Sequence, residues 1–191
     1  MKTILVVGDS ESGKDDLLEF VLDRGKAVLP DYGYLKFDEY LVKDVYGAYN
    51  TSLEGVRKFQ RDFRAKVSRR FGELKAKHEN VIINAHFFTK LRHGFVSLLG
   101  PELFNAFKPD AVIIIELYPR KPDPRIRTLF KKKPIDAKSL RLEQDMIRKF
   151  AAIHAAAAGT MLKFVQVEED NVNAAFRDIM DTVTFILSGG K

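Results

Sequence analysis

An apolar stretch near the start of the chain, residues 4–7, leads through a short polar loop to Gly13 and Lys14. The spacing from Gly8 to Lys14 matches G-x-x-x-x-G-K-[ST], a loop that joins a buried strand to a helix and binds phosphate. Backbone N–H groups and the helix N-terminus surround the phosphate oxygens, and the lysine reaches the outer phosphates. We therefore expect phosphate contacts from this loop, through Gly8, Ser10, Ser12, Gly13, Lys14 and Asp15.

The last position of the motif departs from the pattern, because Asp15 stands where a hydroxyl normally binds Mg²⁺. A carboxylate is a good ligand for a hard cation, so Asp15 would hold the Mg²⁺ of ATP directly. Equally, its charge would repel the phosphates. Two further acids of the loop, Asp9 and Glu11, are expected to point outward. The loop alone is compatible with a nucleotide enzyme and with a nucleotide-enzyme fold that has taken on other work.

Apolar runs alternate with amphipathic segments along the chain. They predict strands at 3–7, 34–37, 81–83, 111–117 and 161–167, and helices at 13–24, 38–46, 52–77, 101–107, 137–158 and 170–187. Residues 87–100 are expected to be a loop with some helix, and 119–133 a basic loop. Strands that alternate with helices behind a phosphate loop predict an α/β, doubly wound, five-stranded parallel sheet in one domain, residues 1–191.

Charge is distributed unevenly over this chain of net charge +6. Residues 52–77 carry nine Lys/Arg against three Asp/Glu, and residues 120–149 carry eleven against four. Such segments indicate contact with nucleotide phosphates or with nucleic acid, or are simply solvated helix faces. The RNA-binding candidates are Arg64, Arg69, Arg70, Lys131, Lys132 and Lys133. The absence of cysteine excludes a thiolate nucleophile and a thiolate metal site, and agrees with a cytoplasmic location.

Polar residues follow the predicted strands at the edge of the sheet where ligands bind. Asn84 and His86 end the strand at 81–83, and His86 would orient a phosphate or a water, or serve as a structural hydrogen-bonding group. Arg125 and Arg127 lie on a loop bounded by prolines, which would close over a phosphoryl group or bind an RNA backbone. Arg148, on the helix at 137–158, would reach the same cleft.

The layout resembles the archaeal-type adenylate kinase family over roughly residues 3–185. The first loop resembles G-x-P-G-x-G-K-[ST], and Val56-Arg57-Lys58 resembles the family's M-R-K, whose arginine binds the AMP phosphate. Ile83 to Phe87 resembles I-D-T-H-A with an amide in place of the acid, and Lys108 to Glu116 resembles N-P-x-x-I-x-L-L-E. Asp38 answers to the acid of N-Y-G-D-x-M, and Arg148 to the arginine of N-R-Y.

The resemblance implies a nucleoside monophosphate kinase that transfers the γ-phosphate of ATP to AMP with Mg²⁺, and a family that often forms trimers. Residues 38–78 would then form a helical acceptor lobe, and residues 119–137 a lid. The implied catalytic residues are Lys14, Arg125, Arg127 and Arg148, and the implied acceptor-binding residues are Asp38, Arg57, Asn84 and His86. The alternative is a nonenzymatic or weakly active relative that binds RNA or ribosomal particles through the basic segments.

Overall fold

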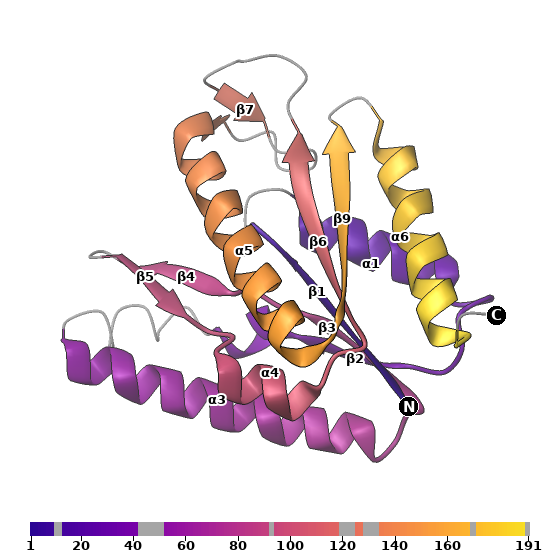
Figure 1. Ribbon diagram of the computed structural model, residues 1–191, viewed down its shortest axis with the longest axis horizontal. Helices are drawn as coiled ribbons and strands as arrows, with labels where there is room; N and C mark the ends of the chain where they lie inside the picture. Colours follow the sequence, from indigo (N-terminus) through magenta and orange to yellow (C-terminus); the bar gives the residue numbers. More distant parts are fainter. Residues whose placement is uncertain are drawn as a thin grey trace.

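Five parallel strands form the centre of the protein in the computed structural model, which describes residues 1–9, 13–41, 52–91, 94–118, 125–127, 134–168 and 171–189. The strands are β1 (Lys2–Gly8), β2 (Gly33–Lys36), β3 (Asn80–Asn84), β6 (Ala111–Tyr118) and β9 (Met161–Glu168). Their order in the sheet is β2-β3-β1-β6-β9 (Figure 1). The central strands are apolar on both faces because helices cover both faces. The predicted doubly wound sheet is confirmed.

Each face of the sheet has its own apolar cluster. Leu5 and Val7 of β1 point into a cluster with α3 (Leu53–Lys75), α4 (Pro101–Phe107) and α5 (Ala137–Ala158). Ile4 and Val6 point to the other face, which packs against α1 (Lys14–Gly25) and α6 (Val172–Leu187). The alternation along β1 therefore sorts its side chains between two helix layers. These layers lie on opposite faces of the sheet (Figure 1).

Several helix ends follow from local sequence. Ser52 precedes α3, and its hydroxyl accepts a hydrogen bond from the Gly55 N–H. Asp136 caps α5 in the same way, and Gly159 ends α5 in the left-handed conformation with φ 64°. The apolar stripe of α3 is buried from Phe59 onward, whereas Leu53 in the first turn is 78% exposed. The first turn of α3 therefore lies beyond the core.

Two segments expected as loops contain short antiparallel strand pairs. Within 87–100, β4 (Phe88–Leu91) pairs with β5 (Gly94–Ser97). Strand β7 (Arg125–Arg127) pairs with β8 (Pro134–Asp136), which leads directly into α5. Whether such short segments form strands depends on the strand that they pair with, and the apolar pattern within each segment does not show this. The rest of the predicted lid, 119–124 and 128–133, lies outside the described residues.

The helix expected at 38–46 begins as one turn of 3₁₀-helix, η1 (Phe37–Tyr40), and residues 42–46 lie outside the described part of the chain. Asp170, the expected first residue of the last helix, also lies outside it, and Asn171 occupies the position before α6. None of the helices within the described ranges combines the length and apolar character that a membrane-spanning segment requires.

Candidate nucleotide-binding site

Lys14 lies inside the protein, at the first position of α1 and beside the end of β1. It is 1% exposed, and its ammonium donates hydrogen bonds to Oδ1 of Asp15 and to Oδ1 of Asn84. Gly13 enters the helix in the left-handed conformation, with φ 75°, which favours glycine. Burial lowers the pKa of Lys14 below its usual value, against the opposing effect of Asp15. The lysine of the phosphate loop is therefore held by two side chains of its own protein.

Gly8 allows this position of Lys14, because the lysine chain passes directly over the glycine. A methyl group at Gly8 would lie 3.0 Å from Cδ of Lys14 and 2.5 Å from the carbonyl oxygen of Ile115 on β6. The second distance is far below van der Waals contact with a backbone atom. Only glycine fits at this position, because the backbone of β6 and the side chain of Lys14 both lie too close to leave space for a Cβ atom.

Asn84, at the end of β3, connects three side chains. Its amide oxygen accepts from Lys14, so its Nδ2 faces the other way and donates to Asp15 Oδ1 and to the Tyr34 hydroxyl, each at 3.0 Å. Tyr34 comes from β2, and its pKa is raised by burial. The network therefore joins β2, β3 and α1 through one amide.

Asp15 is ionised in this network although part of its surroundings opposes the charge. Burial would raise its pKa, but Lys14 and the hydrogen bonds to the carboxylate hold the pKa below its usual value. The side chain keeps 27% exposure. Where the phosphate-loop motif has a hydroxyl, this chain thus has a partly accessible carboxylate, at the N-terminus of α1.

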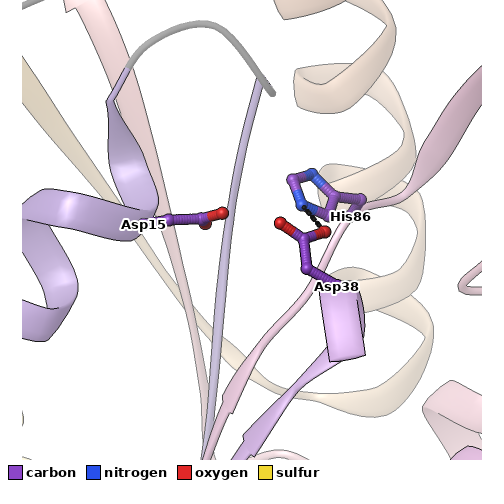
Figure 2. Close-up of side chains that lie close together, drawn as sticks. All are labelled: Asp15, Asp38 and His86. Carbon is purple, nitrogen blue, oxygen red and sulfur yellow. Dashed lines mark ion pairs between the residues drawn. The ribbon is translucent and has the colours of Figure 1, made fainter. Parts of the chain in front are cut away.

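Asp38 and His86 complete this side of the site. Nε2 of His86 lies 3.0 Å from Oδ1 of Asp38, and the carboxylate of Asp15 points toward this pair (Figure 2). One ligand atom from each of the three side chains lies within 4.8 Å of the others. His86 is nearly buried, with a side chain that is 9% exposed, whereas Asp38 is 43% exposed. The group is therefore open on the Asp38 side.

On the other side of β1, Glu116 of β6 holds Arg148 of α5. The two side chains form a bidentate pair, with Nε–Oε1 at 2.7 Å and Nη2–Oε2 at 2.8 Å. The Glu116 side chain is 5% exposed, so the carboxylate is fixed, while that of Arg148 is 44% exposed. This pairing raises the pKa of Arg148, chiefly through the hydrogen bond to Glu116. Arg148 is thus a positioned cation at the carboxyl end of β6.

Gln144, one turn before Arg148, connects α5 to the first loop. Its Nε2 donates to the carbonyl oxygen of Leu117 at 3.1 Å and to Asp9 Oδ2 at 3.4 Å. Asp9 is 1% exposed, so the expectation that it points outward was wrong. The amide of Gln144 gives this carboxylate a hydrogen-bonding partner inside the protein, whereas Glu11 lies outside the described residues.

The structure brings together Gly8, Gly13, Lys14, Asp15, Asn84, Asp38 and His86, all of which were expected at the site. Sequence reasoning missed Tyr34, Gln144 and Glu116. Glu116 carried a signal, as the one charged residue in the apolar run of β6. Ser10, Ser12 and Lys131 to Lys133 lie outside the described residues, and Arg125 and Arg127 are described as the ends of β7.

Three arginines of the basic face of α3 pair with two glutamates of the same chain. Arg64 pairs with Glu102 at 2.5 Å, and Arg70 and Arg69 pair with Glu73 at 3.1 and 3.9 Å. Arg57 is exposed near the start of the helix. Binding of RNA by this face and binding of the acceptor phosphate by Arg57 stay predictions.

The strand order, with Gly8 at the end of the central strand β1 and with Gly13 and Lys14 at the start of the next helix, defines a P-loop fold of the nucleoside monophosphate kinase type. The thymidylate kinase of Candida albicans has this fold, with a TM-score of 0.55, 13% identity and coverage of 95% of this chain and 91% of that one. No family model matches the chain.

Two curated adenylate kinases are similar to this chain over most of their length. An adenylate kinase of Pyrococcus furiosus is 24% identical over 171 residues, which is 87% of each chain. An adenylate kinase of Thermoplasma acidophilum is 26% identical over 186 residues, 94% of this chain and 97% of that one. The protein is a distant homologue of the archaeal adenylate kinases.

Proposed function

We propose that this protein is an ATP-dependent nucleoside monophosphate kinase that uses AMP as acceptor. The observation that carries the proposal is the buried Lys14 at the start of α1, whose ammonium contacts Asp15 of the same helix and Asn84 at the end of β3. Its support from outside the site is the distant homology to archaeal adenylate kinases over most of the chain. A lysine that opens a helix directly after a buried strand is expected at the donor-phosphate side of such an enzyme.

Binding of ATP would exchange one set of partners of Lys14 for another. The ammonium would leave the amide of Asn84 and contact the outer phosphates, whose charge compensates for the burial of the lysine. Backbone N–H groups at the start of α1 would meet the same phosphates. The guanidinium of Arg148, oriented by Glu116, would contribute a second fixed charge from β6 and α5.

The family resemblance implies Mg²⁺ with the nucleotide, and the residues present fit a divalent cation. Asp15 is ionised and partly accessible, at the position where such proteins place a metal-binding hydroxyl. When bound, the ion would neutralise charge on the transferring phosphoryl group. The residues of this chain would position donor and acceptor, and no covalent intermediate is needed.

The test is the formation of ADP from ATP and AMP with a divalent cation. We expect Lys14→Met to lower the turnover at least about 100-fold, the scale for loss of one fixed charge at a phosphoryl group. Lys26→Met is the matched control, because Lys26 follows the end of α1 on the surface, where it pairs with Asp23. Wild-type protein that forms no ADP, or equal rates for wild type and Lys14→Met, would refute the kinase proposal.

A further inference from the structure

Asp15, Asp38 and His86 come from three different elements and converge at one point. They lie on α1, on η1 and just after β3, and Figure 2 shows that the side chains of Asp15 and Asp38 approach one another beside the imidazole. His86 Nε2 and Asp38 Oδ1 are 3.0 Å apart. This equals the separation, about 3 Å, of adjacent ligand atoms around an ion with bonds of about 2.1 Å. The ligand atom of Asp15 lies within 4.8 Å of the other two.

Two of the three ligands are carboxylates that face one another beside the imidazole (Figure 2). Lys14 faces Asp15, and Lys36 pairs with Glu19 at 2.5 Å, while Asp38 faces the imidazole of His86. A divalent cation between Asp15 and Asp38 would attract both carboxylates at once. Hydrogen bonds from Lys14 and Asn84 both end on Oδ1 of Asp15, so Oδ2 can bind an ion without breaking either bond.

We propose that Asp15, Asp38 and His86 form a binding site for a divalent transition metal ion, which the protein holds before any nucleotide binds. Two carboxylates and one imidazole suit Mn²⁺, Co²⁺ or Zn²⁺ better than Mg²⁺, which favours an all-oxygen octahedral shell. The exposure of Asp38 leaves one side of the ion open to water or to phosphate oxygens. The role of this ion in phosphoryl transfer rests on the proposed kinase function, whereas its binding to the nucleotide-free protein does not.

The experiment is titration of the nucleotide-free, full-length protein with Mn²⁺, followed by electron paramagnetic resonance of the free ion. We expect one tight site per chain that persists in a large excess of Mg²⁺. His86→Gln and Asp38→Asn should each weaken Mn²⁺ binding at least about tenfold. The matched control is His78→Gln, because His78 forms a similar pair with Asp31, at 3.1 Å, elsewhere on the surface. Circular dichroism of each variant verifies that it is folded.

Three results would overturn the metal site: no Mn²⁺ binding by folded wild-type protein, complete displacement by Mg²⁺, or equal weakening by His86→Gln and His78→Gln. Failure of the kinase function gives a different pattern. In that case Mn²⁺ binds and depends on His86, but ADP is not formed. If ADP forms with Mg²⁺ alone and Mn²⁺ does not bind, the kinase proposal stands and the metal site is refuted.

Discussion

At the scale of single residues, Gly8 is the position with the least space. We expect Gly8→Ala to lower the free energy of unfolding by about 2 kcal/mol, because the new methyl group would overlap the Ile115 carbonyl on β6. The matched control is Gly72→Ala on α3, where a Cβ meets nothing within 4 Å. Gly72→Ala should raise the free energy of unfolding by about 0.5–1 kcal/mol, because alanine favours a helix more than glycine does. Urea denaturation of both variants measures the difference, and a Gly8→Ala protein as stable as wild type would contradict the close approach.

Asp15 and Asn84 show an exchange of roles relative to the family pattern. The family motifs place a hydroxyl after the lysine and an acid at the end of the third strand, whereas here the acid is Asp15 and the neutral group is Asn84. The pair therefore keeps one carboxylate beside Lys14, contributed by α1 instead of β3.

This exchange makes a prediction about stability. Asp15→Thr alone should lower the free energy of unfolding by about 3 kcal/mol, because it leaves the buried Lys14 without a counter-ion. Adding Asn84→Asp should restore most of the loss, since the carboxylate returns from the other side of the lysine. A double-mutant cycle by urea denaturation measures the coupling. Purely additive effects of the two substitutions would show that Lys14 does not link them.

Some of the residues around Lys14 could be predicted from the sequence, and others could not. Gly8, Lys14, Asp15 and Asn84 were found because their positions follow from spacing after a strand. Tyr34 and Gln144 could not be found that way, because their contacts depend on which strands lie side by side and on the rotation of α5. The segment 87–100 was misjudged for the same physical reason, since an antiparallel hairpin is defined by its pairing and not by local apolar period.

At the scale of elements, an aromatic group joins α5 to the start of the hairpin and to α4. His154 of α5 stacks on Phe104, with ring centroids 5.0 Å apart, and on Phe87, at 6.3 Å. Phe150 of the same helix meets Phe88 edge-on at 4.5 Å. The helix that carries Arg148 and Gln144 is thus anchored on the polypeptide that follows His86.

His154 makes this anchor sensitive to acid. Burial lowers its pKa below the usual 6.5, so the unfolded chain binds the proton more tightly than the folded protein. Stability that is present at neutral pH is therefore lost as the pH falls below 6.5. We expect His154→Phe to keep the ring packing and to show a smaller fall in unfolding midpoint between pH 7 and pH 5. Thermal denaturation of wild type and His154→Phe at each pH measures this fall. Identical pH profiles of the two proteins would show that His154 does not cause the loss of stability in acid.

At the scale of the whole molecule, the two apolar clusters share the same strands. β1 and β3 send alternate side chains into both, so neither helix layer can unfold without exposing the other face of the sheet. The fold should therefore behave as one cooperative unit.

Substitutions in the two layers test this unity. Phe63→Ala on one face and Ile179→Ala on the other should each cost about 3 kcal/mol, because both side chains are at most 2% exposed. Leu53→Ala and Phe185→Ala, on the same helices but exposed, should stay within about 0.5 kcal/mol of wild type. All four should unfold in urea in a single transition by circular dichroism and tyrosine fluorescence. Separate transitions in either core variant would show that the two layers are independent.

The buried Lys14 also makes the order of substitutions matter. Between a hydroxyl–acid pair and the present Asp15–Asn84 pair there are two single-step routes. One passes through a protein with carboxylates on both sides of the lysine, and the other through a protein with none. A buried ammonium tolerates a surplus of negative neighbours better than their absence. A lineage or an engineer moving between the two arrangements therefore keeps more stability along the order in which the incoming acid precedes the loss of the old one.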